Sequence, residues 1–215
     1  MASINTHAAD NTSREQLCSI AKSLFDRGFT HGSTGNLSLR LADGYLMTPT
    51  GSSLGNLDPA RLSHLDSAGN HIDGDKPTKE SFLHLAMYDE RPSGNAVIHL
   101  HATYSTAVSI LRDIDPADVL PPLTAYYVMR IGSLPLVPYY APGDMALAEA
   151  VRGFAGKHHA VLLANHGPVV AGSSLSAATD AIEELEATAR LHLLLQGQAC
   201  RCLTDEQAQA LKTSK

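Results

Sequence analysis

Two histidines, His99 and His101, lie two residues apart in the apolar segment Ala96-Val97-Ile98-His99-Leu100-His101. Such a segment is typical of a β-strand, in which residues i and i+2 point to the same face of the sheet. We therefore expect both imidazoles to point the same way, as the beginning of a transition-metal site. Two histidines that only form hydrogen bonds near a surface would give the same pattern, so the pair alone leaves both interpretations open.

Two further residues extend the metal hypothesis. His166 follows the apolar run 160–164, which predicts a buried strand, and it precedes Gly167-Pro168. A histidine held at such a turn could reach a site on a neighbouring strand, and we predict that it is the third ligand. Glu80 begins a helix that Lys76-Pro77-Thr78-Lys79 introduces. Its carboxylate could cap that helix, or it could face the histidines and ligate metal or move a proton.

Two loops rich in glycine and hydroxyl groups, residues 31–36 and 48–55, adjoin a predicted hairpin of strands 37–41 and 45–47. Glycine allows backbone N–H groups to approach a bound anion closely. Both loops therefore suit phosphate, although either one alone could also be an ordinary turn of a hairpin.

The remaining pattern predicts the elements that must position these residues. Apolar periodicity and capping residues predict helices over 12–28, from 78 onward, at 107–111, over roughly 144–156, over 175–196 and after Thr204. Helices around a hairpin and buried strands predict an α/β fold, a three-layer αβα sandwich with a mostly antiparallel central sheet. We expect one domain over residues 1–215, with polar tails at about 1–11 and 203–215.

Some polar groups carry no predicted chemistry. In the turn-rich, hydrophilic segment 57–75, His64, His71 and several Asp residues are interpreted as surface features, and His84 as a helix-surface or packing histidine. Three glutamates, Glu183, Glu184 and Glu186, are interpreted as one solvated helix face.

Composition excludes several classes of function. The formal net charge is −6 and the chain has no basic run, which argues against binding to nucleic acid. No stretch of eighteen apolar residues predicts a membrane span, and no signal peptide is indicated. The three cysteines, Cys18, Cys200 and Cys202, form no CxxC pair, so we expect a reducing, cytoplasmic environment.

Glu80 at a helix start, His99-x-His101 on a strand and Asn165-His166-Gly167 after another strand together resemble the class II aldolase/adducin family, over about residues 15–196. This resemblance implies that His99, His101 and His166 hold a divalent metal, usually Zn²⁺. It implies that Glu80 is an acid/base residue that also ligates the metal in the empty site. It further implies a phosphate cradle composed of Gly35, Asn36, Thr50, Gly51, Thr78 and Lys79.

Longer strings at residues 48–55, 76–80, 120–130 and 163–168 look like the branch of the family that decarboxylates 3-oxo-tetronate 4-phosphates. The expected reaction yields dihydroxyacetone phosphate and CO₂ through a metal-bound enediolate. A sugar-phosphate aldolase of the fuculose or rhamnulose phosphate type, or a ribulose-phosphate 4-epimerase, is the alternative. A non-catalytic, adducin-like module is the third and least favoured possibility.

The family resemblance also implies partners. The substrate would be a small phosphorylated sugar acid, bound between the subunits of a homotetramer. Tyr126 is the counterpart of a tyrosine that a neighbouring subunit places near the substrate, and the adjoining Tyr127 is the alternative. Lys79 and Arg130 could bind the substrate phosphate or carboxylate, or could be ordinary surface charges.

Overall fold

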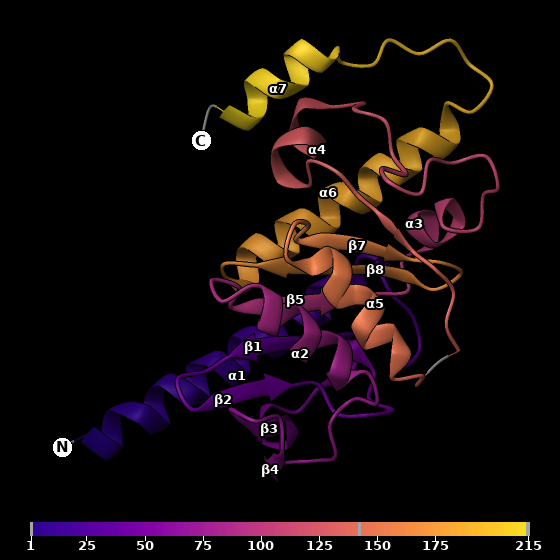
Figure 1. Cartoon of the computed structure of the whole chain (residues 1–215). Coiled ribbons are helices and arrows are strands. Elements are labelled where there is room, and N and C mark those ends of the chain that lie inside the picture. Colours follow the sequence, from indigo (N-terminus) through magenta and orange to yellow (C-terminus); the bar gives the residue numbers. More distant parts are fainter. Residues whose placement is uncertain (1, 142, 214–215) are drawn as a thin grey trace.

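Helices and short strands are interspersed along the chain in the computed structural model, which describes residues 2–141 and 143–213 (Figure 1). The strands are β1 (Asn36–Arg40), β2 (Gly44–Met47), β3 (Ser63–Asp66), β4 (His71–Asp73), β5 (Ala96–His99), β6 (Leu136–Val137), β7 (Ala160–Leu163) and β8 (Gly167–Gly172). They form one sheet in the order β4-β3-β2-β1-β5-β8-β7-β6. Neighbouring strands are antiparallel except for the parallel pair β6 and β7.

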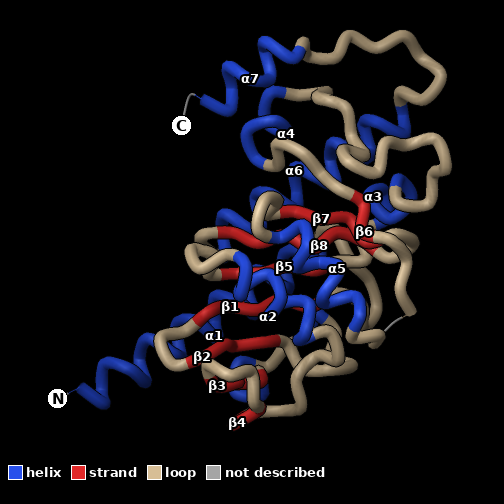
Figure 2. The backbone as a smooth tube through the Cα atoms, viewed as in Figure 1, coloured by secondary structure: helices blue, strands red, loops and turns tan. Residues whose placement is uncertain are grey.

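Helices cover both faces of this sheet (Figure 2). They are α1 (Ala2–Asp26), α2 (Ser81–Glu90), α3 (Thr103–Val108), α4 (Ala125–Arg130), α5 (Ala146–Ala155), α6 (Leu175–Leu194) and α7 (Asp205–Thr213), with two short 3₁₀ helices at Leu54–Asn56 and Pro59–Arg61. The predicted three-layer αβα sandwich with a mostly antiparallel sheet is confirmed. Within the described residues, no helix has both the length and the apolar character that crossing a bilayer requires.

The sheet has a hydrophobic core on each face, and successive side chains of β5 contribute to the two cores in turn. Val97 packs in the core beneath α2 and α5, whereas Ile98 packs in the core beneath α1, α3 and α6. Because successive residues of a strand point to opposite faces, His99 points to the same face as Val97, toward α2. Both faces of β5 are fully buried.

The first helix begins earlier than predicted. The capping-box pattern at Thr12–Glu15 predicts a helix start, but α1 already begins at Ala2 and runs through it. No glycine or proline interrupts residues 2–12, so the helix has no local reason to stop there. The polar segment 2–11 is therefore helical, while residues 1, 214 and 215 of the predicted tails lie outside the described residues. At the other end, Thr204 and Gln207 form a reciprocal capping box for α7, as predicted.

The turn-rich, hydrophilic segment 57–75 contains two strands that the sequence pattern does not predict. This segment contains β3 and β4, which extend the sheet beyond β2. Every residue of β4 is exposed, and this edge strand has no apolar alternation that a sequence pattern could reveal.

The interpretation of Glu186 as a solvated residue is wrong. Its side chain is buried and accepts hydrogen bonds from the backbone N–H groups of Tyr104 and Ser105, at 2.7 and 2.8 Å. The Ser105 hydroxyl donates a third bond, at 2.7 Å. Glu186 thus caps the first turn of α3, the helix that follows His101, by binding N–H groups that lack partners within the helix.

Replacement of Glu186 by alanine is expected to lower the free energy of unfolding by about 2–3 kcal/mol, because two buried N–H groups and one hydroxyl lose their acceptor. Urea denaturation measures this change. The matched control is Glu183→Ala, which removes a surface ion pair with Arg27 and should change stability by less than about 1 kcal/mol. Equal losses in both variants would contradict the capping role.

Candidate metal and phosphate site

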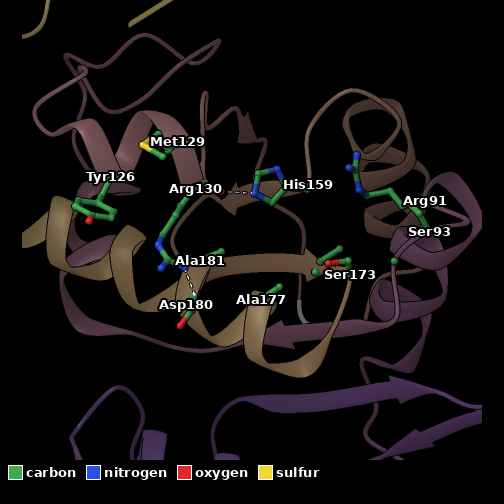
Figure 3. Close-up of a pocket in the computed structure, with 13 residues that line it drawn as sticks. Arg91, Ser93, Tyr126, Met129, Arg130, His159, Ser173, Ala177, Asp180 and Ala181 are labelled. Atoms are coloured by element: carbon green, nitrogen blue, oxygen red, sulfur yellow. Dashed lines mark hydrogen bonds and ion pairs between the residues drawn. The ribbon is translucent and has the colours of Figure 1, made fainter. Parts of the chain in front are cut away.

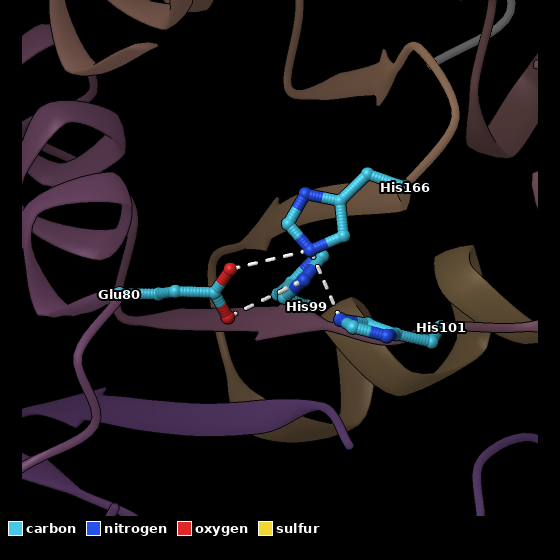
Figure 4. Close-up of side chains that lie close together, drawn as sticks. All are labelled: Glu80, His99, His101 and His166. Atoms are coloured by element: carbon cyan, nitrogen blue, oxygen red, sulfur yellow. Dashed lines mark hydrogen bonds and ion pairs between the residues drawn. The ribbon is translucent and has the colours of Figure 1, made fainter. Parts of the chain in front are cut away.

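Four side chains from three segments of the chain converge in one place (Figure 4): Glu80, His99, His101 and His166. One potential ligand atom from each lies within 4.8 Å of the others. His166 Nε2 is 3.0 Å from His101 Nε2 and 3.3 Å from Glu80 Oε1, and His99 Nε2 is 3.5 Å from Glu80 Oε2. The structure thus brings together all four residues that the sequence analysis connected to a metal.

His99 is the last residue of β5 and is fully buried. Its Nδ1 donates a hydrogen bond to the carbonyl of Pro168 at 2.9 Å, so Nε2 carries the lone pair of the neutral ring. That Nε2 is buried and has no hydrogen-bond partner. A buried acceptor without a hydrogen-bond partner, facing two other imidazoles and a carboxylate, suits a cation. The four residues therefore fit a metal ion.

A tight turn between β7 and β8 aims His166 at this cluster. Asn165 adopts a left-handed conformation, with φ 59°, and its N–H donates to Ser109 Oγ at 3.0 Å. The carbonyl of His166 accepts a bond from Thr106 Oγ1 at 3.1 Å. At Gly167, φ is 154° and a Cβ atom would lie 2.2 Å from the carbonyl oxygen of Leu100, so only glycine fits there.

Glu80 immediately precedes α2 but does not cap it. Its side chain makes no hydrogen bond to the first turn of the helix and instead faces the histidines. Asn36 Nδ2 donates to Glu80 Oε2 at 2.8 Å. The capping interpretation is therefore wrong, and the structure supports the alternative in which the carboxylate belongs to the site.

Electrostatics favour neutral imidazoles beside an ionised carboxylate. Burial lowers the pKa of His99 to about 4 and also lowers the pKa of His101. Burial opposes ionisation of Glu80, but its attraction to His99 and its hydrogen bonds to His166 and Asn36 outweigh burial and hold its pKa well below the usual range. A carboxylate and neutral imidazoles are the forms that bind a metal.

The cluster opens into a pocket with a volume of about 940 Å³. All six residues of the predicted phosphate cradle line this pocket: Gly35, Asn36, Thr50, Gly51, Thr78 and Lys79. Backbone bonds from Thr50 N to Lys76 O, at 2.9 Å, and from Thr78 N to Thr48 O, at 3.1 Å, join the second loop to the segment before Glu80. The hydroxyl-rich loops therefore share one cavity with His101, His166 and Glu80.

Several residues near the site, among them Tyr139, Tyr140 and His84, were not predicted to take part. Tyr139 and Tyr140 line the pocket, and nothing in their local sequence indicates this position. His84 is buried within hydrogen-bond distance of Asn36, which in turn contacts Glu80. Its spacing of four residues from Glu80, which places both on one side of the helical turn, was the available signal.

Tyr126 and Arg130 lie elsewhere in the chain (Figure 3). Both line a second pocket, of about 420 Å³, which contains none of the three histidines. Tyr126 is exposed, and Arg130 forms an ion pair with Asp180 at 2.7 Å. The alternative residue Tyr127 is buried. Within this chain neither tyrosine reaches the metal cluster, so their predicted role depends entirely on a neighbouring subunit.

The fold and this cluster define a family. Residues 15–193 match the family described as Class II Aldolase and Adducin N-terminal domain, and the chain belongs to that family.

Curated relatives and solved structures agree with this assignment. The chain is 51% identical, over 93% of its length and 95% of the relative, to a protein of Escherichia coli K12 named 3-oxo-tetronate 4-phosphate decarboxylase. A protein of Haemophilus influenzae with the same name is 50% identical over 94% of this chain and 97% of the relative. The crystal structure of Escherichia coli YgbL matches with a TM-score of 0.93 and 48% identity, over 95% of this chain and 100% of that one.

Proposed function

We propose that this protein is a metal-dependent 3-oxo-tetronate 4-phosphate decarboxylase, which converts its substrate to dihydroxyacetone phosphate and CO₂. The observation that carries the proposal is the convergence of Glu80 and three histidines, of which Glu80, His101 and His166 line the same pocket as two glycine- and hydroxyl-rich loops. The names of relatives about half identical over nearly the whole chain support this substrate. They also support a lyase that acts on a carbon–carbon bond.

Zn²⁺ is the proposed metal, held by His99, His101, His166 and, before substrate binds, Glu80. Three imidazoles that leave a further position open hold zinc in some catalytic sites, and carboxylates also bind this ion. When bound, the metal would act as a Lewis acid that stabilises negative charge on the substrate oxygens.

The chain's own residues would bind the substrate and move a proton. Backbone N–H groups at Gly35 and Gly51 and the ammonium of Lys79 would hold the phosphate. Loss of CO₂ breaks the bond between carbons 1 and 2 and leaves its electron pair on carbon 2. Glu80 would then deliver a proton to carbon 2. Because Glu80 is ionised in the substrate-free protein, it must first take that proton from a substrate hydroxyl or from water.

The decisive experiment incubates zinc-loaded protein with 3-oxo-tetronate 4-phosphates and measures CO₂ release and dihydroxyacetone phosphate. Turnover of the oxo acid is expected, and its absence would contradict the proposal. Fuculose, rhamnulose and ribulose phosphates form the second arm. An L-fuculose phosphate aldolase of Methanocaldococcus jannaschii is 37% identical over 84% of this chain, so cleavage of fuculose phosphate would instead identify an aldolase. No turnover of any compound would favour a non-catalytic module.

Replacement of Lys79 by methionine is expected to raise KM for the phosphorylated substrate about tenfold, because one charge-assisted hydrogen bond is lost. The value of kcat should change less, since Lys79 does not touch the reacting carbon. Steady-state kinetics measure both constants. Lys76→Met is the matched control, because Lys76 is an exposed lysine outside the pocket lining. An unchanged KM in Lys79→Met would remove Lys79 from the phosphate site.

We further propose a homotetramer with the sites between subunits, in which Tyr126 of one subunit approaches the pocket of the next. The exposure of Tyr126 outside its own chain's site supports this arrangement. Three free thiols, two of them exposed, support a cytoplasmic location.

A further inference from the structure

A chain of buried hydrogen bonds leads from the interior to Glu80. Asn36 Nδ2 donates to Glu80 Oε2 at 2.8 Å, and His84 Nε2 lies 2.6 Å from Asn36 Oδ1. On the other side of the ring, His84 Nδ1 lies 2.7 Å from Ser38 Oγ, which lies 2.9 Å from the hydroxyl of Tyr88. Each of the four residues behind Glu80 is at least nine-tenths buried.

The bond from Asn36 Nδ2 to Glu80 Oε2 fixes the direction of the other bonds in this chain. Because Asn36 turns its NH₂ group toward Glu80, its oxygen faces His84 and can only accept. His84 therefore donates from Nε2. Burial lowers the pKa of His84 to about 3, so the ring is neutral and its Nδ1 is an acceptor. Ser38 then donates to Nδ1 and accepts from Tyr88, and each polar group in the series has a partner.

We propose that His84 is a positioning residue that fixes the side-chain amide of Asn36 and, through it, the carboxylate of Glu80. This inference rests on the proposed function, in which Glu80 moves the proton. With Oε2 held by Asn36, Oε1 lies 3.3 Å from His166. Without the bond from His84, the Asn36 amide is free to rotate and Glu80 loses a fixed direction toward carbon 2. Proton transfer depends steeply on such alignment.

The test is a double-mutant cycle on kcat at saturating substrate, with zinc content measured for each protein. His84→Leu is expected to lower kcat roughly 10- to 100-fold, the usual effect of removing a group that orients a site residue. Asn36→Ala should lower it comparably. If His84 acts through Asn36, adding His84→Leu to Asn36→Ala should change kcat by less than about twofold. The proposal would be overturned if the decrease in kcat of the double variant equals the product of the two single decreases. It would also be overturned if kcat of His84→Leu stays within twofold of the wild-type value.

Two variants separate positioning from general support of the fold. His84→Gln keeps an N–H donor of similar reach and should retain kcat within about fivefold of wild type. Tyr88→Phe removes a buried hydroxyl from the same chain without touching Asn36, so it should lower the melting temperature while kcat stays within about twofold. Equal loss of kcat in His84→Gln and His84→Leu would contradict the role of the donor. If His84→Leu does not fold, His84→Met provides a second apolar replacement.

Crystal structures of the wild type and of the folded apolar variant give a readout that needs no turnover. We expect the bond between Asn36 Nδ2 and Glu80 Oε2 to be lost or displaced in the variant. Retention of the bond would overturn the positioning role, whatever the activity. A wild-type protein that lacks decarboxylase activity but loses this bond on replacement of His84 would contradict the proposed reaction and leave the positioning role intact.

Discussion

Replacement of His99 by alanine is expected to abolish both metal binding and decarboxylation. The variant retains only two of the three imidazoles, His101 and His166, beside Glu80. Loss of about 4 kcal/mol or more of metal-derived charge stabilisation corresponds to a decrease in kcat/KM of at least about 10³-fold. Elemental analysis of protein purified without chelator measures the metal, and CO₂ release measures turnover.

Replacement of a histidine outside the cluster is the control for His99→Ala. His71 lies on the exposed edge strand β4, where its Nε2 bonds to the carbonyl of Asp73. His71→Ala should therefore keep wild-type metal content and activity. Because His99 also donates to the buried carbonyl of Pro168, circular dichroism must show that His99→Ala is folded. A folded His99→Ala protein with one metal ion per chain would contradict the proposed ligand set.

The second large effect is expected for Glu80→Gln, which preserves the shape of the side chain and removes its ability to carry a proton. A general acid or base typically raises the rate of the catalysed step 10²–10⁴-fold, so kcat should fall by roughly that factor. Metal content should stay near one ion per chain, because three imidazoles remain. Single-turnover measurement of CO₂ and of dihydroxyacetone phosphate shows whether protonation is the step that slows.

The control for this variant is Glu149→Gln, which alters an exposed carboxylate on α5 that pairs with Arg152. Its kinetics should equal those of the wild type. Full activity of Glu80→Gln would exclude Glu80 from the proton transfer, and simultaneous loss of metal would show that the three imidazoles do not hold the ion without the carboxylate.

Local sequence patterns were sufficient to predict those parts of the fold in which all residues of a segment share one environment. The apolar runs ending at His99 and before His166 could be recognised as buried strands because their side chains are aliphatic on both faces. Likewise, the hydroxyl and glycine residues of the two loops indicated an anion pocket before any contact was known. Residues of both loops line one cavity together with His101 and His166.

Other parts depend on contacts that no local pattern contains. Glu186 has the same sequence surroundings as its solvated neighbour Glu183, and only the packing of α6 against α3 buries it. Strand β4 is held by backbone hydrogen bonds to β3 while its side chains remain exposed, so hydropathy could not reveal it. Tyr126 could be matched to a family position, but within this chain it lines a pocket that contains none of the three histidines.

The pairing of β5 with β8 has a consequence for how the sheet avoids misalignment. His99 pairs with Val169, and the residues before His99 on β5 are Ala96, Val97 and Ile98, which are apolar on both faces. A slip by one residue would exchange one aliphatic face for the other, and hydrophobic burial alone would oppose it only weakly. The same slip would turn the imidazole of His99 away from Glu80 and into an aliphatic core. Burial of the His99 imidazole among aliphatic side chains thus makes the shifted register less stable than the native one. A chain with the shifted register would also lack the site.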